Sequence, residues 1–215
     1  MTACFLPGLH LPMPKRNALP SFVPPQLSQL VKVPPEGDAW AHEVKYDGYR
    51  LQARLAGREV KLLTRTGLDW TDRYPATAKE TSSIRARNAY LEGELCAVRP
   101  DGTTSFAELQ AATDSRSTGH LVYFAFDLLF LNGRDMTGSP LLDRKGRLQS
   151  LLKGAPQSIQ YSGHHIGDGK RILDAACRAK AEGINSKRVD CELGVSVRRR
   201  PSTWLRPMAS TRRCG

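Results

Sequence analysis

Residues 43–50, which read EVKYDGYR, hold the side chains best suited to chemistry in this 215-residue chain. Lys45 lies at the end of an apolar stretch, just before the turn-forming pair Asp47-Gly48. A lysine that is withdrawn from water and flanked by other cations or a metal loses its proton more readily, and its neutral amine is a nucleophile. The segment therefore predicts a nucleophilic Lys45 at the edge of a cleft. The alternative is an ordinary β-hairpin whose charged side chains face water.

Patterns of apolar and polar residues predict the strands that must hold this segment in place. These strands span residues 39–46, 48–56, 59–65, 89–98, 121–131 and 184–190. Asp47-Gly48 is expected to form a tight turn between the first two strands, and Pro100-Asp101-Gly102 a turn after the fourth. The run 121–131 is the most apolar in the chain and is expected to be buried.

Three helices are predicted between and after these strands. The first covers residues 106–112, with Ser105 as its N-cap. The second covers residues 141–152, where Pro140 precedes leucines spaced to share one helical face. The third begins after Asp168 and is expected to stop at Gly183. This order of elements predicts an α+β fold built around antiparallel sheets.

The two ends of the chain differ from its middle. Residues 1–37 hold eight of the 14 prolines, which favours an extended arm lying over the domain and not a core element. The segment 191–215 is rich in arginine and has no clear period, so a basic tail without regular structure is one interpretation of it.

Composition limits the classes of function. The formal net charge of +11 favours an anionic partner, most simply nucleic acid or nucleotide phosphates. No apolar run is long enough to span a membrane. The five cysteines are scattered without a CxxC pair, so neither a zinc ribbon nor a disulfide scaffold is indicated. The N-terminus lacks the charge order of a secretory signal, which favours the cytoplasm.

The octet 43–50 resembles the KxDGxR adenylation motif of the covalent nucleotidyltransferases, which include ATP-dependent DNA ligases, RNA ligases and capping enzymes. The resemblance implies that Lys45 attacks the α-phosphate of ATP to form a lysyl-AMP phosphoramidate. It also implies that Arg50 lies near the ribose or the nick, and that the region of Glu43 meets the adenine.

Two further segments resemble motifs of the same family. Arg65-Thr66-Gly67 resembles an element on the sugar-phosphate side of the nucleotide, although such a tripeptide is also common in turns. Glu92-Gly93-Glu94 resembles the family's DGE element, in which the position of Glu94 faces the ribose or the metal shell. Taken alone, a glycine between solvated acids in a strand is the simpler interpretation.

Two more motifs follow in the family's order. Phe126 occupies the position of an aromatic ring that stacks on adenine, although most phenylalanines in strands belong to the core. The segment 182–188, EGINSKR, resembles EGIVSKR of bacterial ligases. There the resemblance implies that Glu182 helps to hold Mg²⁺ and that Lys187 offsets phosphate charge. Motif order and flanking sequence resemble bacterial ATP-dependent ligases of the end-joining type over residues 19–190; RNA ligases and capping enzymes fit the flanks less well.

The C-terminal segment departs from that pattern. The family's last motif reads W-x-K-x-K, whereas this chain has Trp204-Leu205-Arg206-Pro207-Met208. Arg206 keeps a positive charge for the α-phosphate, but as a forked donor, and Met208 keeps none. The sequence ends at Gly215, and the OB-fold domain of the family is expected to be absent.

The sequence thus predicts an α+β nucleotidyltransferase (ATP-grasp-like) domain of antiparallel sheets flanked by helices. Its expected parts are an arm at 1–37, the ligase adenylation domain at 38–190 and a basic segment at 191–215. The resemblance implies ATP and Mg²⁺ (or Mn²⁺) as cofactors, nicked or broken DNA and a Ku-like end-binding protein as partners, and a role at the bacterial nucleoid in DNA repair, recombination and replication.

Two alternatives remain open at this point. One is a nucleotide-binding relic that is impaired because Met208 replaces a lysine. The other is a basic nucleic-acid-binding module without catalysis, which would rely on the arginines at 198–200 and 212–213.

Overall fold

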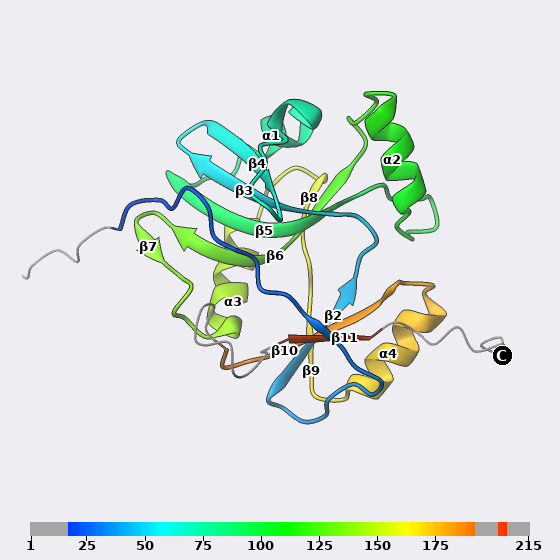
Figure 1. The fold of residues 1–215 in the computed structure, drawn as a ribbon. Coiled ribbons are helices and arrows are strands. Elements are labelled where there is room, and N and C mark those ends of the chain that lie inside the picture. The colour runs from blue at the N-terminus through cyan, green and yellow to red at the C-terminus, as the bar shows by residue number, and fades with distance from the viewer. Residues whose placement is uncertain (1–16, 192–201, 206–215) are drawn as a thin grey trace, which may run out of the picture.

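The computed structural model describes residues 17–191 and the backbone of residues 202–205. Two sheets face each other across the molecule, and helices lie beyond them and beside them (Figure 1). The fold is α+β, as predicted, and most strand pairs are antiparallel.

The larger sheet has six strands. Its main path runs β4 (Glu59–Thr64), β3 (Tyr49–Ala56), β5 (Asn88–Cys96), β6 (Val122–Leu131) and β7 (Arg134–Asp135), and β8 (Ile159–Tyr161) pairs in parallel with β6. The smaller sheet runs β1 (Gln29–Leu30), β11 (Ser202–Leu205), β10 (Gly183–Arg188), β2 (Trp40–Lys45) and β9 (His165–Ile166). The six strands expected from the sequence correspond to β2, β3, β4, β5, β6 and β10.

Four α-helices and one short 3₁₀ helix accompany the sheets within the described residues. They are η1 (Thr71–Arg73), α1 (Pro75–Thr81), α2 (Phe106–Asp114), α3 (Leu141–Leu151) and α4 (Gly169–Arg178). α3 packs against β6, and α4 packs against β10 and β2. The N-caps of α2 and α4 agree with the sequence: Ser105 accepts a hydrogen bond from the Glu108 amide, and Asp168 accepts one from the Arg171 amide.

The main hydrophobic core lies against the six-stranded sheet. Alternate residues of β3, including Leu51 and Leu55, are fully buried together with Leu91 and Leu95 of β5 and Leu128 of β6. Burying apolar side chains in this way is the main favourable contribution to folding. The core therefore packs on one face of the six-stranded sheet, and polar residues can be held on the other face.

Asp47-Gly48 does not form the tight turn that was expected between the first two strands, and the alternative of an ordinary β-hairpin is excluded as well. β2 pairs with β10 and β9, whereas β3 pairs with β4 and β5, so the chain crosses here from one sheet to the other. Asp47 accepts a hydrogen bond from the Phe106 amide, at the start of α2. A side chain at position 48 would place its Cβ 2.3 Å from the Leu95 carbonyl oxygen, so the crossing requires glycine.

The predicted end of the third helix was also wrong. α4 ends at Arg178, and Lys180 adopts a left-handed conformation with φ 55°. The amide of Ala181 then bonds to the Ala176 carbonyl, which closes the last turn. Gly183 is instead the first residue of β10.

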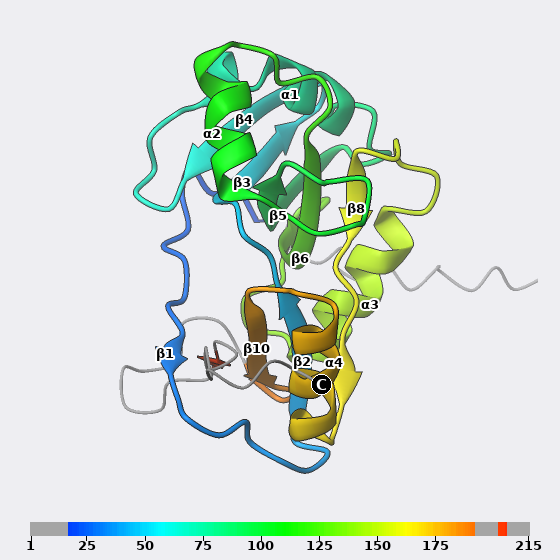
Figure 2. The same ribbon diagram turned by 90° about the vertical axis from the view of Figure 1, so that its right-hand side faces the viewer.

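The N-terminal arm is more integrated than the sequence suggested. Leu19, Phe22 and Val23 pack against a small cluster of buried residues on the six-stranded sheet. The chain then runs from that sheet down to β1, which pairs in parallel with β11 (Figure 2). The arm thus links the two sheets, and residues 202–205 form a strand inside the segment for which an unstructured tail was considered.

Candidate active site

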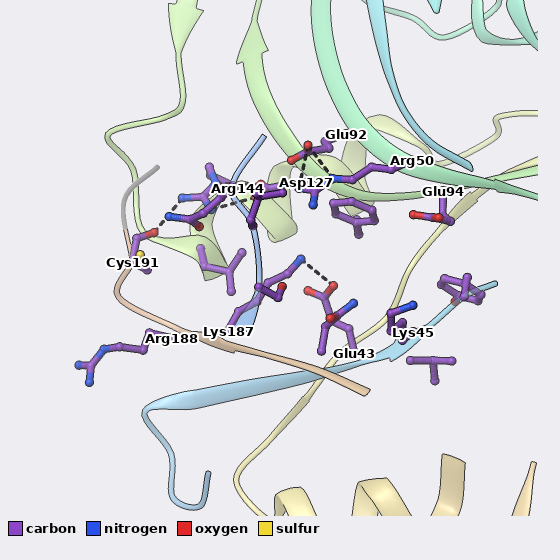
Figure 3. A pocket seen from close by; sticks show the side chains of 18 of the residues that line it. Glu43, Lys45, Arg50, Glu92, Glu94, Asp127, Arg144, Lys187, Arg188 and Cys191 are labelled. Atoms are coloured by element: carbon purple, nitrogen blue, oxygen red, sulfur yellow. Dashed lines mark hydrogen bonds and ion pairs between the residues drawn. The ribbon is translucent and has the colours of Figure 1, made fainter. Parts of the chain in front are cut away.

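A cavity of about 470 Å³ lies between the two sheets and receives side chains from both (Figure 3). Its lining includes Glu43 and Lys45 from β2, Asn185, Lys187 and Arg188 from β10, Arg50 from β3, Glu92 and Glu94 from β5, Phe126 and Asp127 from β6, and Arg65, Arg144 and Cys191. Residues 26–28 of the arm complete the wall. The site predicted from the sequence is therefore brought together by elements far apart in the chain.

The pairing of β2 with β10 explains how four polar side chains share one face. In the antiparallel register, Glu43 lies opposite Asn185, and Lys45 lies opposite Gly183. Since side chains alternate along a strand, Glu43 and Lys45 point to the same side. Asn185 and Lys187, also two residues apart, follow the same rule, and this face of the smaller sheet lines the cavity.

Lys45 forms an ion pair with Glu182, the residue just before β10. Both side chains are partly exposed, at 25% and 22%. Glu182 itself is not part of the cavity lining, but its carboxylate reaches the lysine that is. An amine held at the end of a strand and open to a cavity can meet a substrate there.

Glu43 is the anchor of a buried cluster of charges. Its two carboxylate oxygens each lie 2.8 Å from an ammonium nitrogen, Oε1 from Lys145 Nζ and Oε2 from Lys187 Nζ. Burial alone would raise the pKa of Glu43, but the two lysines hold this pKa below its ordinary value. The carboxylate therefore stays charged and fixes Lys187 at the cavity wall.

Phe126 contributes an accessible aromatic surface. It is only partly buried and belongs to none of the hydrophobic core clusters found among the described residues. Lys187 Nζ lies 4.4 Å from the ring centroid, and the Arg50 guanidinium carbon lies 5.5 Å from it. Arg50 is itself fixed by Glu92, with 2.9 Å between Arg50 Nη2 and Glu92 Oε1. A ring with cations beside it is suited to a flat, anionic ligand such as a nucleotide.

Glu94 faces the same cavity from β5. Burial raises its pKa to about 8, although Arg50 and Lys45 act in the opposite direction. Within the described residues, no hydrogen-bond donor reaches its carboxyl group, and no cluster of three or more metal-ligating side chains is present. Mg²⁺ is commonly held by one or two carboxylates, with water and substrate phosphates as its other ligands. Glu94 and Glu182 fit that donor set.

Of the candidates named from the sequence, seven line the cavity: Glu43, Lys45, Arg50, Arg65, Glu94, Phe126 and Lys187. Arg206 and Met208 lie outside the described residues, as do the arginines at 198–200 and 212–213.

Sequence reasoning assigned no role in the site to the supporting side chains. Lys145 is fully buried beneath Glu43. Arg144 forms a two-point ion pair with Asp127, at 2.8 and 3.0 Å, and also donates to the Cys191 carbonyl. The adjacent basic pair on an otherwise amphipathic helix was the available signal, but its partners could not be located from the sequence.

No helix in the described ranges is long and apolar enough to cross a membrane.

Comparison with known families matches residues 25–206 to the model described as ATP dependent DNA ligase domain. The chain is 35% identical over 193 residues to the multifunctional non-homologous end joining protein LigD of Pseudomonas aeruginosa, covering 89% of this chain and 22% of that protein. It is 28% identical over 198 residues to LigD of Mycolicibacterium smegmatis, covering 92% of this chain and 25% of that protein. The chain thus spans about a quarter of the length of these relatives.

A solved structure gives the same fold. The mycobacterial DNA ligase D complexed with ATP and MES superposes with a TM-score of 0.74 at 28% identity. The match covers 85% of this chain and 59% of that chain. The two-sheet architecture described above is therefore shared with a solved DNA ligase structure.

Proposed function

The chain belongs to the family of ATP-dependent DNA ligase domains, and we propose that it performs the adenylation step of DNA ligation through Lys45. The observation that carries the proposal is the place of Lys45, at the end of β2 and inside a cavity lined by cations and an aromatic ring. Residues 38–190 would form the adenylation domain, residues 1–37 an arm, and residues 191–215 a basic segment with a degraded last motif.

In the proposed step, the neutral amine of Lys45 attacks the α-phosphorus of ATP. A nitrogen–phosphorus bond forms, the bond from the α-phosphorus to the bridging oxygen breaks, and pyrophosphate leaves. Because only the neutral amine is a nucleophile, the proton of Lys45 passes to solvent and the ion pair with Glu182 opens before the attack. The product is AMP linked to Lys45 as a phosphoramidate.

The other cavity residues would bind and orient the nucleotide. Phe126 offers its ring to the adenine, and the region of Glu43 borders the base. Arg50 and Arg65 would lie on the sugar-phosphate side, and Lys187 would offset phosphate charge. Arg206 would add a further cation. Fixed charges of this kind lower the barrier when they are already in place before the reaction.

Glu94 and Glu182 would hold Mg²⁺ (or Mn²⁺), with Glu94 alternatively meeting the ribose. The bound ion would neutralise charge that develops on the phosphates during the transfer.

The nucleic acid that receives AMP would be DNA with a 5′-phosphate at a nick or break. The formal net charge of +11 supports a polyanionic partner. The similarity to LigD proteins supports end joining as the setting. The proposal further includes a Ku-like end-binding protein as partner and a location in the cytoplasm at the nucleoid.

A label-transfer experiment tests this proposal. The protein is incubated with α-labelled ATP and Mg²⁺, freed of nucleotide, and mixed with nicked DNA bearing either a 5′-phosphate or a 5′-hydroxyl. We expect label on the protein that moves to the 5′-phosphate DNA alone. Labelled protein that transfers nothing would indicate the impaired relic. DNA binding without any label, lost on deletion of residues 191–215, would indicate the basic module.

A further inference from the structure

Lys145 is a charged residue with no exposed surface. It lies on α3, packed against the six-stranded sheet, and is 0% exposed. Its ammonium has three N–H donors and contacts three acceptor oxygens: Glu43 Oε1 at 2.8 Å, the Phe126 carbonyl at 3.1 Å and the Ser162 carbonyl at 3.1 Å. The side chain therefore ties α3 and β6 to β2 of the smaller sheet.

Stability alone gives little reason for a lysine at this place. Moving an ammonium out of water is unfavourable, and buried ion pairs often add no more stability than apolar residues of similar volume. The contacts of Lys145 have another consequence, because two of its three acceptors belong to residues that line the cavity. One is the carboxylate of Glu43, and the other is the backbone of Phe126.

The Glu43 contact leads to a second lysine. With Oε1 held by Lys145, Oε2 accepts from Lys187 Nζ at 2.8 Å. Lys187 Nζ is thereby held 4.4 Å from the Phe126 ring centroid. One buried ammonium thus sets the positions of a cation and of an aromatic ring in the cavity wall.

We propose that Lys145 is a positioning residue of the nucleotide site: through Glu43 and the Phe126 carbonyl, it holds Lys187 and the Phe126 ring where they meet the base and phosphates. The inference rests on the proposed function. It predicts that Lys145 acts on nucleotide affinity and not only on folding.

The test measures ATP binding by isothermal titration calorimetry with Mg²⁺, in the full chain carrying Lys45→Ala to prevent turnover. Lys145→Met is expected to bind ATP about tenfold more weakly. Lys145→Arg keeps the charge but cannot converge on three acceptors, so a loss of about threefold is expected. Leu148→Ala is the matched control, since Leu148 is a fully buried residue on the same helix. It lowers stability but is expected to change ATP affinity by less than about twofold.

A double variant tests the route through Glu43. The double variant, Glu43→Gln with Lys145→Met, is compared with the single variant that has the lower ATP affinity. We expect its affinity to be lower than that of this single variant by no more than about twofold. Fully additive losses would exclude a route through Glu43 and so contradict the proposal.

Acidity provides a readout that a general loss of packing does not change. The charged or titratable groups facing Glu43 are Lys145, Lys187, Tyr46, Tyr161 and His164. Without Lys145, one of the two cations that keep Glu43 ionised is gone, so the carboxyl protonates at higher pH and releases Lys187. ATP affinity of Lys145→Met should therefore fall more steeply than that of Leu148→Ala as the pH decreases from 8 to about 6.

The outcomes separate this inference from the proposed function. Absence of ATP binding in the Lys45→Ala parent overturns both. Binding in the parent, with Lys145→Met folded and equal to it in affinity, overturns this inference alone. If Lys145→Met does not fold, the ATP affinities of Lys145→Arg and Leu148→Ala are compared, and a larger loss in Lys145→Arg supports the inference. An equal loss in those two variants shows that affinity merely follows stability.

Discussion

Lys45 and Glu182 form an ion pair across the junction of β2 and β10, although 137 residues separate them in the chain. The pairing of Lys45 with Gly183 in the β2–β10 ladder places the two side chains side by side. The proposed nucleophile is therefore paired with a neighbour that is itself a candidate metal ligand. Adenylation requires this contact to be broken.

Removing the charge of Glu182 should separate binding from chemistry. We expect Glu182→Gln to lower the rate of AMP transfer at saturating ATP by about 10²-fold, because a carboxylate beside the reacting phosphate is lost. KM for ATP should change by less than about threefold, since a negative charge near the polyphosphate is also removed. Rapid-quench adenylation kinetics measure both values. The control is Glu108→Gln at an exposed surface ion pair, and an unchanged rate in Glu182→Gln would remove Glu182 from the site.

The Phe126 ring should determine ATP affinity. Phe126→Leu keeps the apolar character but removes the aromatic face, so KM for ATP should rise by about tenfold. Phe126→Tyr keeps the ring and should remain within about threefold of the wild type. Steady-state titration of both variants checks this, and a normal KM for Phe126→Leu would mean that the ring does not stack on the base.

Glu94 should make the free protein less stable as the pH rises. Its folded-state pKa of about 8 lies above the ordinary value of 4.5, so between these values the native state keeps a proton that the unfolded chain has lost. The penalty is absent below pH 4.5 and complete near pH 8. Because Glu94 is partly open to the cavity, we expect Glu94→Gln to be more stable than the wild type by about 2 kcal/mol at pH 8 and equal to it near pH 4.5.

Urea unfolding in buffer free of metal and nucleotide measures this difference at several pH values. The exposed residue Glu59 supplies the control, since Glu59→Gln should show no such trend. An offset between Glu94→Gln and the wild type that does not vary with pH would contradict the assignment.

The crossing between the two sheets should tolerate no side chain at Gly48. A Cβ added at this position would lie 2.3 Å from the Leu95 carbonyl oxygen and 2.7 Å from Cys96 Sγ, so β3 or β5 would have to move. Gly48→Ala should lower the free energy of unfolding by about 3 kcal/mol. Gly163→Ala has open space around the new Cβ and should change it by less than about 1 kcal/mol. Denaturant titration compares the two variants, and equal stabilities would refute the close contact.

The parts of the site that could be predicted are those carried by short segments. Lys45, Glu43 and Arg50 lie within eight residues of each other, and Phe126 lies in a strand recognisable from its own composition. The strand and helix positions follow in the same way from local patterns of apolar residues. The α+β fold class could be predicted for this reason, and the structure confirms it.

The missed features depend on which segments meet in space. The pairing of β2 with β10, and not with the adjacent β3, has no local signal, so the prediction of a tight turn between β2 and β3 was wrong. The same holds for Lys145, because the sequence predicts its helix but assigns no role to this residue. Its partner Glu43 lies 102 residues away, and burial of a charged side chain becomes evident only when that partner is known.

The central claim is that AMP becomes linked to Lys45. Intact-protein mass spectrometry after incubation with ATP and Mg²⁺, followed by peptide mapping, tests it directly, with Lys45→Arg as the charge-conserving control. We predict the mass of one AMP on the wild type, located on the peptide that contains Lys45, and no adduct on Lys45→Arg. An adduct that persists in Lys45→Arg, or that maps to another residue, would contradict the account.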